Sequence, residues 1–156
     1  MQNLPALYSI RLLEKSAIRH KLIVLPRPPR SAADIVELFG CELAQVIKTL
    51  LFIGDKQVLA CVPGDKKVDL KKLCRAVGAA RLAIASPTEV KRITGFNVGG
   101  VCPFLPLDGI EAVLDSGCLQ RSTINIGAGT ETTGIELLAE DLEKIWPGII
   151  ADISRA

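Results

Sequence analysis

The strongest hydrophobic pattern in the sequence is a run of eight apolar or β-forming residues, Val-Ile-Lys-Thr-Leu-Leu-Phe-Ile, at positions 46–53. Successive side chains of a strand point to opposite faces, so a run that is apolar on both faces predicts a strand covered on two sides. Gly54-Asp-Lys56 is typical of a turn, and a second apolar run follows at 57–62. We therefore expect a β-hairpin over residues 46–62.

Helices are predicted where apolar residues recur every three or four positions between capping residues. Ser31 and Asp69 are expected N-caps, Gly40 and Gly78 follow their helices, and Ser86-Pro-Thr-Glu89 is a capping box with proline at the first helical position. The expected helices cover residues 5–20, 32–39 and 70–77, a short stretch from 87 that ends at Gly95, and 140–146, which Pro147-Gly148 ends.

Further strands are expected between these helices, and the sequence contains no internal repeat or linker. They fall at residues 22–25, 82–85, 111–114, 123–126 and 135–138, with a last strand or docked tail at 149–153 and a loop at 96–107. Interleaved helices combined with hairpins favour an α+β fold over a doubly wound parallel sheet. We predict a single domain over residues 1–156, a mixed and largely antiparallel β-barrel or sheet surrounded by helices.

Composition narrows the classes of function. The chain has 156 residues, a net charge of +2, one histidine and five scattered cysteines. Without a CxxC pair, a zinc site is not expected, and the cysteines are typical of small buried residues in a reducing compartment. Charged residues interrupt the N-terminal apolar positions, and no run of about 18 apolar residues occurs, so we expect neither a signal peptide nor a membrane span. We expect a cytoplasmic protein without a cofactor.

Lys48 is the first candidate for chemistry, because it lies inside the two-sided apolar strand. By the period of two, Val46, Leu50 and Phe52 share its face. Such a lysine can extend its ammonium to solvent, pair with a carboxylate or lie at a cavity. At a cavity, desolvation would lower its pKa, and the ammonium could stabilise a developing negative charge. The residues alone leave these alternatives open.

The second candidate is the segment Gly99-Gly-Val-Cys-Pro-Phe104. Paired glycines let backbone approach a ligand closely, although a plain surface loop has the same composition. Cys102 is expected to line a pocket and not to act as a nucleophile, because His20 is the only histidine that could serve as its base. Gly127-x-Gly129 has the wrong spacing for a dinucleotide fingerprint and is interpreted as a hairpin loop.

Basic residues concentrate between positions 66 and 92, with a few acidic residues among them. Lys71, Lys72 and Arg75 point away from the apolar face of their predicted helix. They are interpreted either as a solvated face or as contacts to the phosphates of a nucleic acid, whose affinity comes largely from such charges.

In order along the chain, these motifs resemble the YbaK/ProX family of aminoacyl-tRNA deacylases, which is related to the editing domain of bacterial prolyl-tRNA synthetase. Gln45-Val-Ile-Lys-Thr-Leu-Leu51 after a helix is similar to the family's "KTL" strand. Gly99 to Pro103 is similar to its GxxxP loop, and residues 126–142 resemble its C-terminal hairpin and helix. Cys102 and Leu105 depart from the residues found in many relatives, Ser and Gly, which leaves the shape of the pocket open.

The resemblance implies metal-independent hydrolysis of the ester in mischarged aminoacyl-tRNA, with tRNA as substrate and a synthetase as a possible partner. It assigns the catalytic role to Lys48, as an electrostatic anchor for the ester. Substrate-binding residues by the same resemblance are Thr49, Gly99, Gly100, Val101, Cys102, Pro103 and Phe104. Cysteine, alanine and proline remain open as the amino acid removed. The alternatives are a non-catalytic tRNA-binding module and a hydrolase or binder of a small metabolite other than tRNA.

Overall fold

The computed structural model describes residues 4–104 and 109–156. The helices are α1 (Leu4–Lys15), α2 (Ala32–Phe39), α3 (Leu70–Val77), α4 (Pro87–Thr94) and α5 (Ala139–Ile145), with 3-10 turns η1 (Leu43–Gln45) and η2 (Ser116–Leu119). The strands are β1 (His20–Val24), β2 (Ile47–Gly54), β3 (Gln57–Pro63), β4 (Lys67–Val68), β5 (Leu82–Ile84), β6 (Ile110–Asp115), β7 (Thr123–Gly127), β8 (Thr133–Leu138), β9 (Ile149–Ala151) and β10 (Ser154–Arg155).

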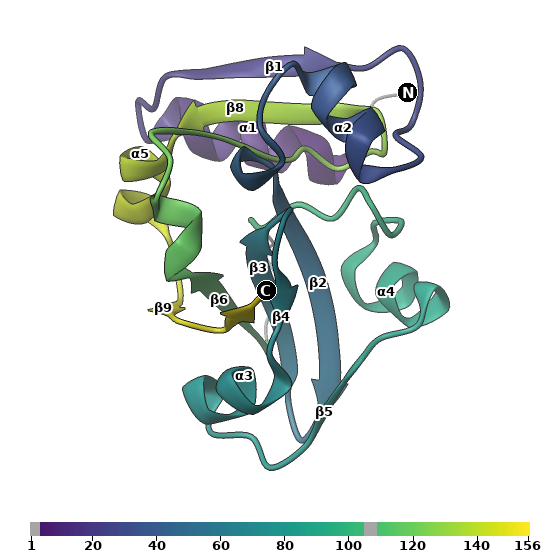
Figure 1. The fold of residues 1–156 in the computed structure, drawn as a ribbon, viewed down its shortest axis with the longest axis vertical. Helices are drawn as coiled ribbons and strands as arrows, with labels where there is room; N and C mark the ends of the chain where they lie inside the picture. Colours follow the sequence, from purple (N-terminus) through teal and green to yellow (C-terminus); the bar gives the residue numbers. More distant parts are fainter. Residues whose placement is uncertain (1–3, 105–108) are drawn as a thin grey trace.

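The strands form a five-stranded sheet of order β5-β2-β3-β6-β9, a three-stranded sheet β1-β8-β7 and a pair β10-β4. The β3–β6 and β6–β9 pairs are parallel and the other pairs are antiparallel. An isolated parallel β-bridge between Val46 and Asn125 connects the two larger sheets. In Figure 1 the β1–β8 sheet lies with α1 and α2 at one end of the long axis, and α3 lies at the other end. The predicted class, α+β with a mixed and largely antiparallel sheet, is confirmed.

Local capping places the helices as the sequence predicts. The Ser31 hydroxyl accepts a hydrogen bond from the backbone N–H of Asp34 at 3.1 Å, and Asp69 accepts one from Lys72 at 3.1 Å. Both bonds of the Ser86–Glu89 capping box are present. Gly40, Gly78 and Gly95 each take the left-handed conformation that ends a helix.

Two predicted elements are shorter than expected. The first helix ends at Lys15 and does not extend to residue 20, because Ala17 takes a φ of 57° and the Ile18 N–H turns back to the Leu13 carbonyl. In the last apolar stretch, 149–153, only residues 149–151 form a strand, β9, and the separate strand β10 that follows the stretch pairs with β4. Residues 105–107 of the predicted loop, including Leu105, lie outside the described residues.

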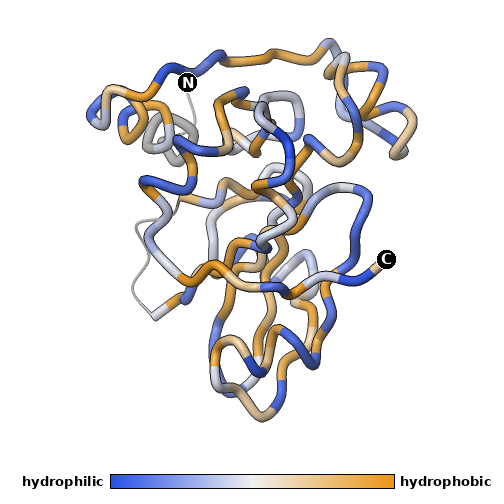
Figure 2. Tube along the Cα trace, turned by 60° about the vertical axis from the view of Figure 1, so that its left-hand side comes forward, coloured by the Kyte–Doolittle hydropathy of each residue, from blue (hydrophilic) through white to orange (hydrophobic). Residues whose placement is uncertain are grey.

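The β2–β3 hairpin separates two hydrophobic clusters, as its two-sided apolar pattern predicts. Ile47, Leu51 and Leu59 belong to the larger cluster, and Phe52 and Val58 belong to the smaller one, which α3 covers. The hydrophobic positions run through the centre of the trace, and many hydrophilic positions lie on turns at its outside (Figure 2). The strand that carries Lys48 is therefore held from both sides.

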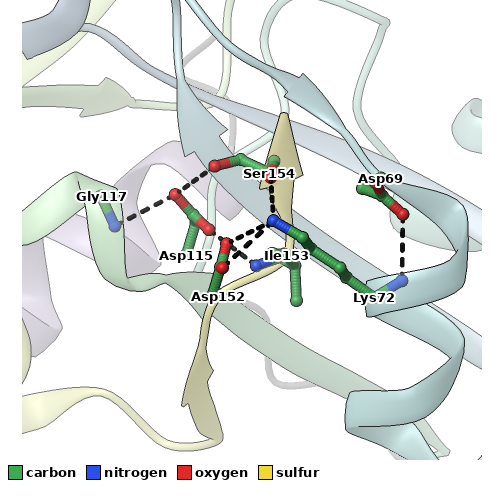
Figure 3. A network of polar contacts seen from close by, with 7 residues as sticks. All are labelled: Asp69, Lys72, Asp115, Gly117, Asp152, Ile153 and Ser154. Atoms are coloured by element: carbon green, nitrogen blue, oxygen red, sulfur yellow. Dashed lines mark hydrogen bonds and ion pairs between the residues drawn. The ribbon is translucent and has the colours of Figure 1, made fainter. Parts of the chain in front are cut away.

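The C-terminal segment is fixed by a buried carboxylate (Figure 3). Asp115, at the end of β6, is fully buried and accepts hydrogen bonds from the Ile153 N–H at 2.8 Å, the Ser154 hydroxyl at 2.9 Å and the Gly117 N–H at 3.0 Å. Lys72 donates to Asp152 at 3.1 Å and to the Ser154 carbonyl at 2.8 Å. These contacts bind the end of the chain to both β6 and α3.

Candidate active site

A cavity of about 240 Å³ lies where β2, α2, the loop after α4 and the β7–β8 hairpin come together. Its lining is mostly apolar, with a few polar groups, which is typical of a site for a small molecule or a small group of a larger one. The lining residues are Pro29, Ile35, Phe39, Val46, Ile47, Lys48, Thr49, Leu50, Val98, Gly99, Val101, Asn125, Ile126, Gly127, Glu131 and Thr133.

Lys48 brings a positive charge to this cavity from the second position of β2. Burial is the main cause that lowers the pKa of Lys48, the nearby Lys67 lowers it further, and Asp65 raises it in part. Within the described parts of the chain, no hydrogen bond or ion pair engages the Lys48 ammonium. The half-buried ammonium is therefore available to a bound negative charge.

Two polar residues of the cavity were not among the candidates from the sequence, because one lies just before the predicted C-terminal hairpin and the other lies in its glycine-rich loop. Glu131 is exposed in the β7–β8 turn and also lines the cavity. Asn125, on β7, is 2% exposed. Nothing in the sequence pointed to Asn125, because a polar residue between Ile124 and Ile126 is the ordinary alternation of a half-exposed strand.

Close backbone packing joins two walls of the cavity. A Cβ atom on Gly127 would lie 2.5 Å from the Val101 carbonyl oxygen, and one on Gly100 would lie 2.8 Å from the Thr130 backbone. Only glycine permits these approaches. The prediction that Gly127-x-Gly129 belongs to a hairpin is confirmed by the β7–β8 pairing. Glycine is required at position 127 because the Val101 backbone packs against it.

The predicted substrate-binding residues separate into two groups. Thr49, Gly99 and Val101 line the cavity together with Lys48. Gly100, Cys102, Pro103 and Phe104 are all buried, and none of these four belongs to the described lining. The expectation that Cys102 lines the pocket is therefore not met.

Packing explains why the second half of the loop turns inward. Cys102 and Phe104 both join the larger hydrophobic cluster. The Cys102 thiol contacts the Ser9 hydroxyl, and the Phe104 ring lies 6.4 Å from the Trp146 ring, between centroids. Burial of these apolar groups in the core lowers the free energy of the fold more than their exposure at a cavity wall would. Burial also raises the pKa of Cys102 to about 11, which keeps the thiol protonated.

The proline-rich segment before α2 supplies a further wall through Pro29. Arg27 and Asp34 form a bidentate ion pair, in which the distance between Nη2 of Arg27 and Oδ1 of Asp34 is 2.7 Å. The hydrogen bonds from Arg27 lower the pKa of Asp34 to about 2. This pair fixes the segment on the first turn of α2, whose Ile35 and Phe39 face the cavity.

The basic residues of α3 do not share this cavity. Lys71 and Arg75 are exposed, whereas Lys72 is half-buried and engaged with Asp152 and Ser154. Helix α3 lies at the end of the molecule away from β1 and β8 (Figure 1).

Within residues 4–104 and 109–156, no three His, Cys, Asp or Glu side chains gather in a group that could hold a metal ion. No helix in the same ranges has both the length and the apolar character needed to cross a membrane.

Comparison with known proteins shows the family to which the chain belongs. Residues 27–145 match the family described as the aminoacyl-tRNA editing domain, and this range includes every lining residue of the cavity. The chain belongs to the aminoacyl-tRNA editing domain family. The family predicted from the KTL strand, the GxxxP loop and the C-terminal hairpin is therefore confirmed, and with it a function in aminoacyl-tRNA editing.

Relatives of this editing domain occur both as free-standing proteins and within synthetases. The chain is 31% identical over 126 residues to EbsC of Enterococcus faecalis, a candidate Cys-tRNA(Pro)/Cys-tRNA(Cys) deacylase, covering 80% of the chain and 77% of EbsC. It is 35% identical over 105 residues to the proline–tRNA ligase of Pelotomaculum thermopropionicum, covering 67% of the chain but only 18% of the ligase.

A crystal structure supports the same assignment. The editing domain superimposes on a candidate trans-editing enzyme for prolyl-tRNA synthetase with a TM-score of 0.84, at 28% identity and over the full length of both chains. The likeness spans all of the described elements, so the cavity lies on a scaffold shared with that protein.

Proposed function

We propose that this editing domain acts in trans as a deacylase, which hydrolyses the ester between a small amino acid and the terminal adenosine of a mischarged tRNA. The observation that carries the proposal is the unpaired ammonium of Lys48 at the wall of a small, mostly apolar cavity. The cytoplasm is the proposed location, since aminoacyl-tRNA is consumed there.

Lys48 is proposed as the electrostatic catalyst. Attack of water on the ester places a negative charge on the carbonyl oxygen, and a fixed positive donor stabilises that charge most where water is excluded. The walls around Lys48 include Val46, Leu50 and Val101, which are apolar. The proposed chemistry uses no metal ion, because the lysine supplies the charge.

Glu131 gives the cavity a charge of the opposite sign. An aminoacyl ester carries an α-ammonium group two bonds from the carbonyl carbon, and a carboxylate binds such a group well. Lys48 and Glu131 do not pair with each other in the described residues. We propose that Glu131 receives the ammonium, that backbone groups of Gly99 and Val101 hold the amino acid, and that the ribose hydroxyl of the terminal adenosine positions the attacking water.

The cavity has room for a small amino acid. Its volume of about 240 Å³, bounded by Ile35, Phe39 and Ile126, is sufficient for a small side chain. Cysteine is the leading candidate, since EbsC is named for Cys-tRNA, and alanine and proline have similar size.

The tRNA body would lie outside the cavity. We propose Lys71 and Arg75 of α3 as phosphate contacts, because both side chains are exposed. The affinity of proteins for nucleic acid comes largely from such positive charges. Lys72 contributes less, since its ammonium is already bound by Asp152. A prolyl-tRNA synthetase is the proposed partner, in view of the related domain in proline–tRNA ligase.

Deacylation of a panel of tRNAs tests the proposal. Release of the amino acid is measured for tRNAs that carry cysteine, alanine, serine, proline or phenylalanine. We expect rapid release of one or more of the small amino acids, with no loss of rate after the enzyme is dialysed against a chelator. Binding of tRNA without release of any amino acid would instead establish a non-catalytic tRNA-binding protein.

The rate of deacylation is expected to fall at alkaline pH, with a midpoint below the usual pKa of a lysine side chain. The active ammonium form of Lys48 is present below its pKa and is lost as the pH rises through it, and burial has lowered that pKa. Asp65→Asn removes a charge that raises the pKa of Lys48, so it should move the midpoint to still lower pH. The measurement is kcat/KM against pH after subtraction of spontaneous hydrolysis. A midpoint unmoved by Asp65→Asn would contradict its assignment to Lys48.

A further inference from the structure

Asn125 has a polar atom that nothing in the described protein satisfies. Its side-chain carbonyl oxygen, Oδ1, is buried and has no hydrogen-bond partner, and it is the single buried side-chain nitrogen or oxygen of this kind in the described residues. The amide nitrogen of the same side chain donates to the Cys41 thiol at 3.5 Å. A buried carbonyl without a partner is destabilising, and such groups are rare in folded proteins.

The position of Asn125 connects this unsatisfied atom to the cavity. The residue lines the same cavity as Lys48, and its strand is joined to Val46 by the bridge between the two larger sheets. Ile35, Phe39 and Ile126 of the same lining offer no side-chain hydrogen-bonding group. The hydroxyls of Thr49 and Thr133, which also line the cavity, contact the Cys61 thiol and the Thr130 hydroxyl. The terminal torsion of asparagine is broad, so the amide can turn toward a bound group without leaving its strand.

We infer that Asn125 is a specificity-determining residue, whose amide hydrogen-bonds the polar atom of a cysteine or serine side chain in the aminoacyl group. The inference rests on the proposed function, because it places an aminoacyl ester in the cavity. In the proposed function, Lys48 binds the ester carbonyl oxygen and Glu131 binds the α-ammonium. The remaining part of the aminoacyl group that Asn125 can bind is the side chain of the amino acid. A thiol or a hydroxyl both donates and accepts, and so fits either end of the amide.

The same geometry disfavours amino acids of similar size without a polar atom. Alanine or proline would leave Oδ1 buried and unpartnered, and a site that hydrogen-bonds its substrate discriminates against the analogue that lacks the group. The editing domain should therefore prefer cysteinyl and seryl esters to alanyl esters by about tenfold or more.

The experiment measures binding and turnover separately. Non-hydrolysable adenosine analogues with a cysteinyl, seryl or alanyl group joined through an amide are titrated into the wild type and into Asn125→Leu, which keeps the size of the side chain. We expect the wild type to bind the seryl and cysteinyl analogues at least about tenfold more tightly than the alanyl analogue, and Asn125→Leu to abolish the difference. The ratio of kcat/KM values for Cys-tRNA and Ala-tRNA should change in the same way.

Cys41→Ala is the matched control. It removes the thiol that now accepts a hydrogen bond from the Asn125 amide, and Cys41 is not part of the described cavity lining. It should leave the preference for cysteinyl and seryl groups unchanged. Equal weakening of all three analogues in Asn125→Leu, or the same loss in Cys41→Ala, would overturn the inference by showing a structural role. If Asn125→Leu fails to fold, equal binding of the seryl and alanyl analogues to the wild type would also overturn it. Binding with this preference but without turnover would contradict the proposed deacylase and not the role of Asn125.

Discussion

Replacement of Lys48 by methionine is expected to lower kcat/KM for deacylation by about 10²–10³-fold, the usual loss when one preorganised charge donor is removed. Methionine keeps most of the apolar stem of the lysine and removes only the ammonium. The fold should persist, because no ion pair or hydrogen bond of the described residues depends on that ammonium. The measurement is single-turnover release of the amino acid from the best substrate of the panel.

Lys144→Met is the matched control for this change. Lys144 lies on α5 with 70% of its side chain exposed and pairs with Asp141, one turn away, so its loss should leave the rate near that of the wild type. Circular dichroism and thermal unfolding of both variants separate a catalytic loss from a folding defect. Full activity in a folded Lys48→Met protein would show that the charge at this wall does not carry the chemistry.

Replacement of Asp115 by alanine is expected to lower the free energy of unfolding by about 2–5 kcal/mol, since hydrogen bonds to a charged group are worth more than neutral ones and their donors would be left unpaired. The carboxylate is fully buried and holds the Ile153 and Gly117 N–H groups and the Ser154 hydroxyl (Figure 3). Its loss should also detach β10 from β4. Urea unfolding gives the stability, and amide exchange at residue 153 reports the detachment.

Asp152→Ala separates this buried network from the exposed ion pair beside it. Asp152 contacts Lys72 with 67% of its side chain exposed, so its removal should change stability little. If the two variants unfolded at the same urea concentration, the buried carboxylate would not be the group that fixes the C-terminal segment.

The parts of the fold that were predictable from sequence are those set by neighbouring residues. The Ser86–Glu89 box and the glycines after α2 and α3 determine helix ends through bonds within four residues. The β2–β3 hairpin follows from its turn and its two apolar runs. The parallel pairing of β3 with β6 was not predictable, because it joins strands about fifty residues apart and depends on packing that no short pattern encodes.

The candidate site divides in the same way. Lys48 stood out because a charge inside a two-sided apolar strand conflicts with its surroundings, and the glycine–proline loop stood out by composition. The loop's inward half was misplaced, since Cys102 and Phe104 enter the core when Trp146, distant in sequence, provides a packing partner. Asn125 precedes the predicted C-terminal hairpin motif and Glu131 lies in its glycine-rich loop, where neither stood out, and only the β7–β8 pairing brings them to the cavity.

The sequence by itself determined the helices with their caps, the central hairpin, the family and the lysine at its centre, because each depends on local periodicity, on capping or on a short ordered motif. The tertiary structure alone decided that a cavity exists beside Lys48, which loop residues reach it and that a buried amide oxygen is left without a partner. Those features depend on the approach of segments that are far apart along the chain, such as Val101 against Gly127 and Val46 beside Asn125.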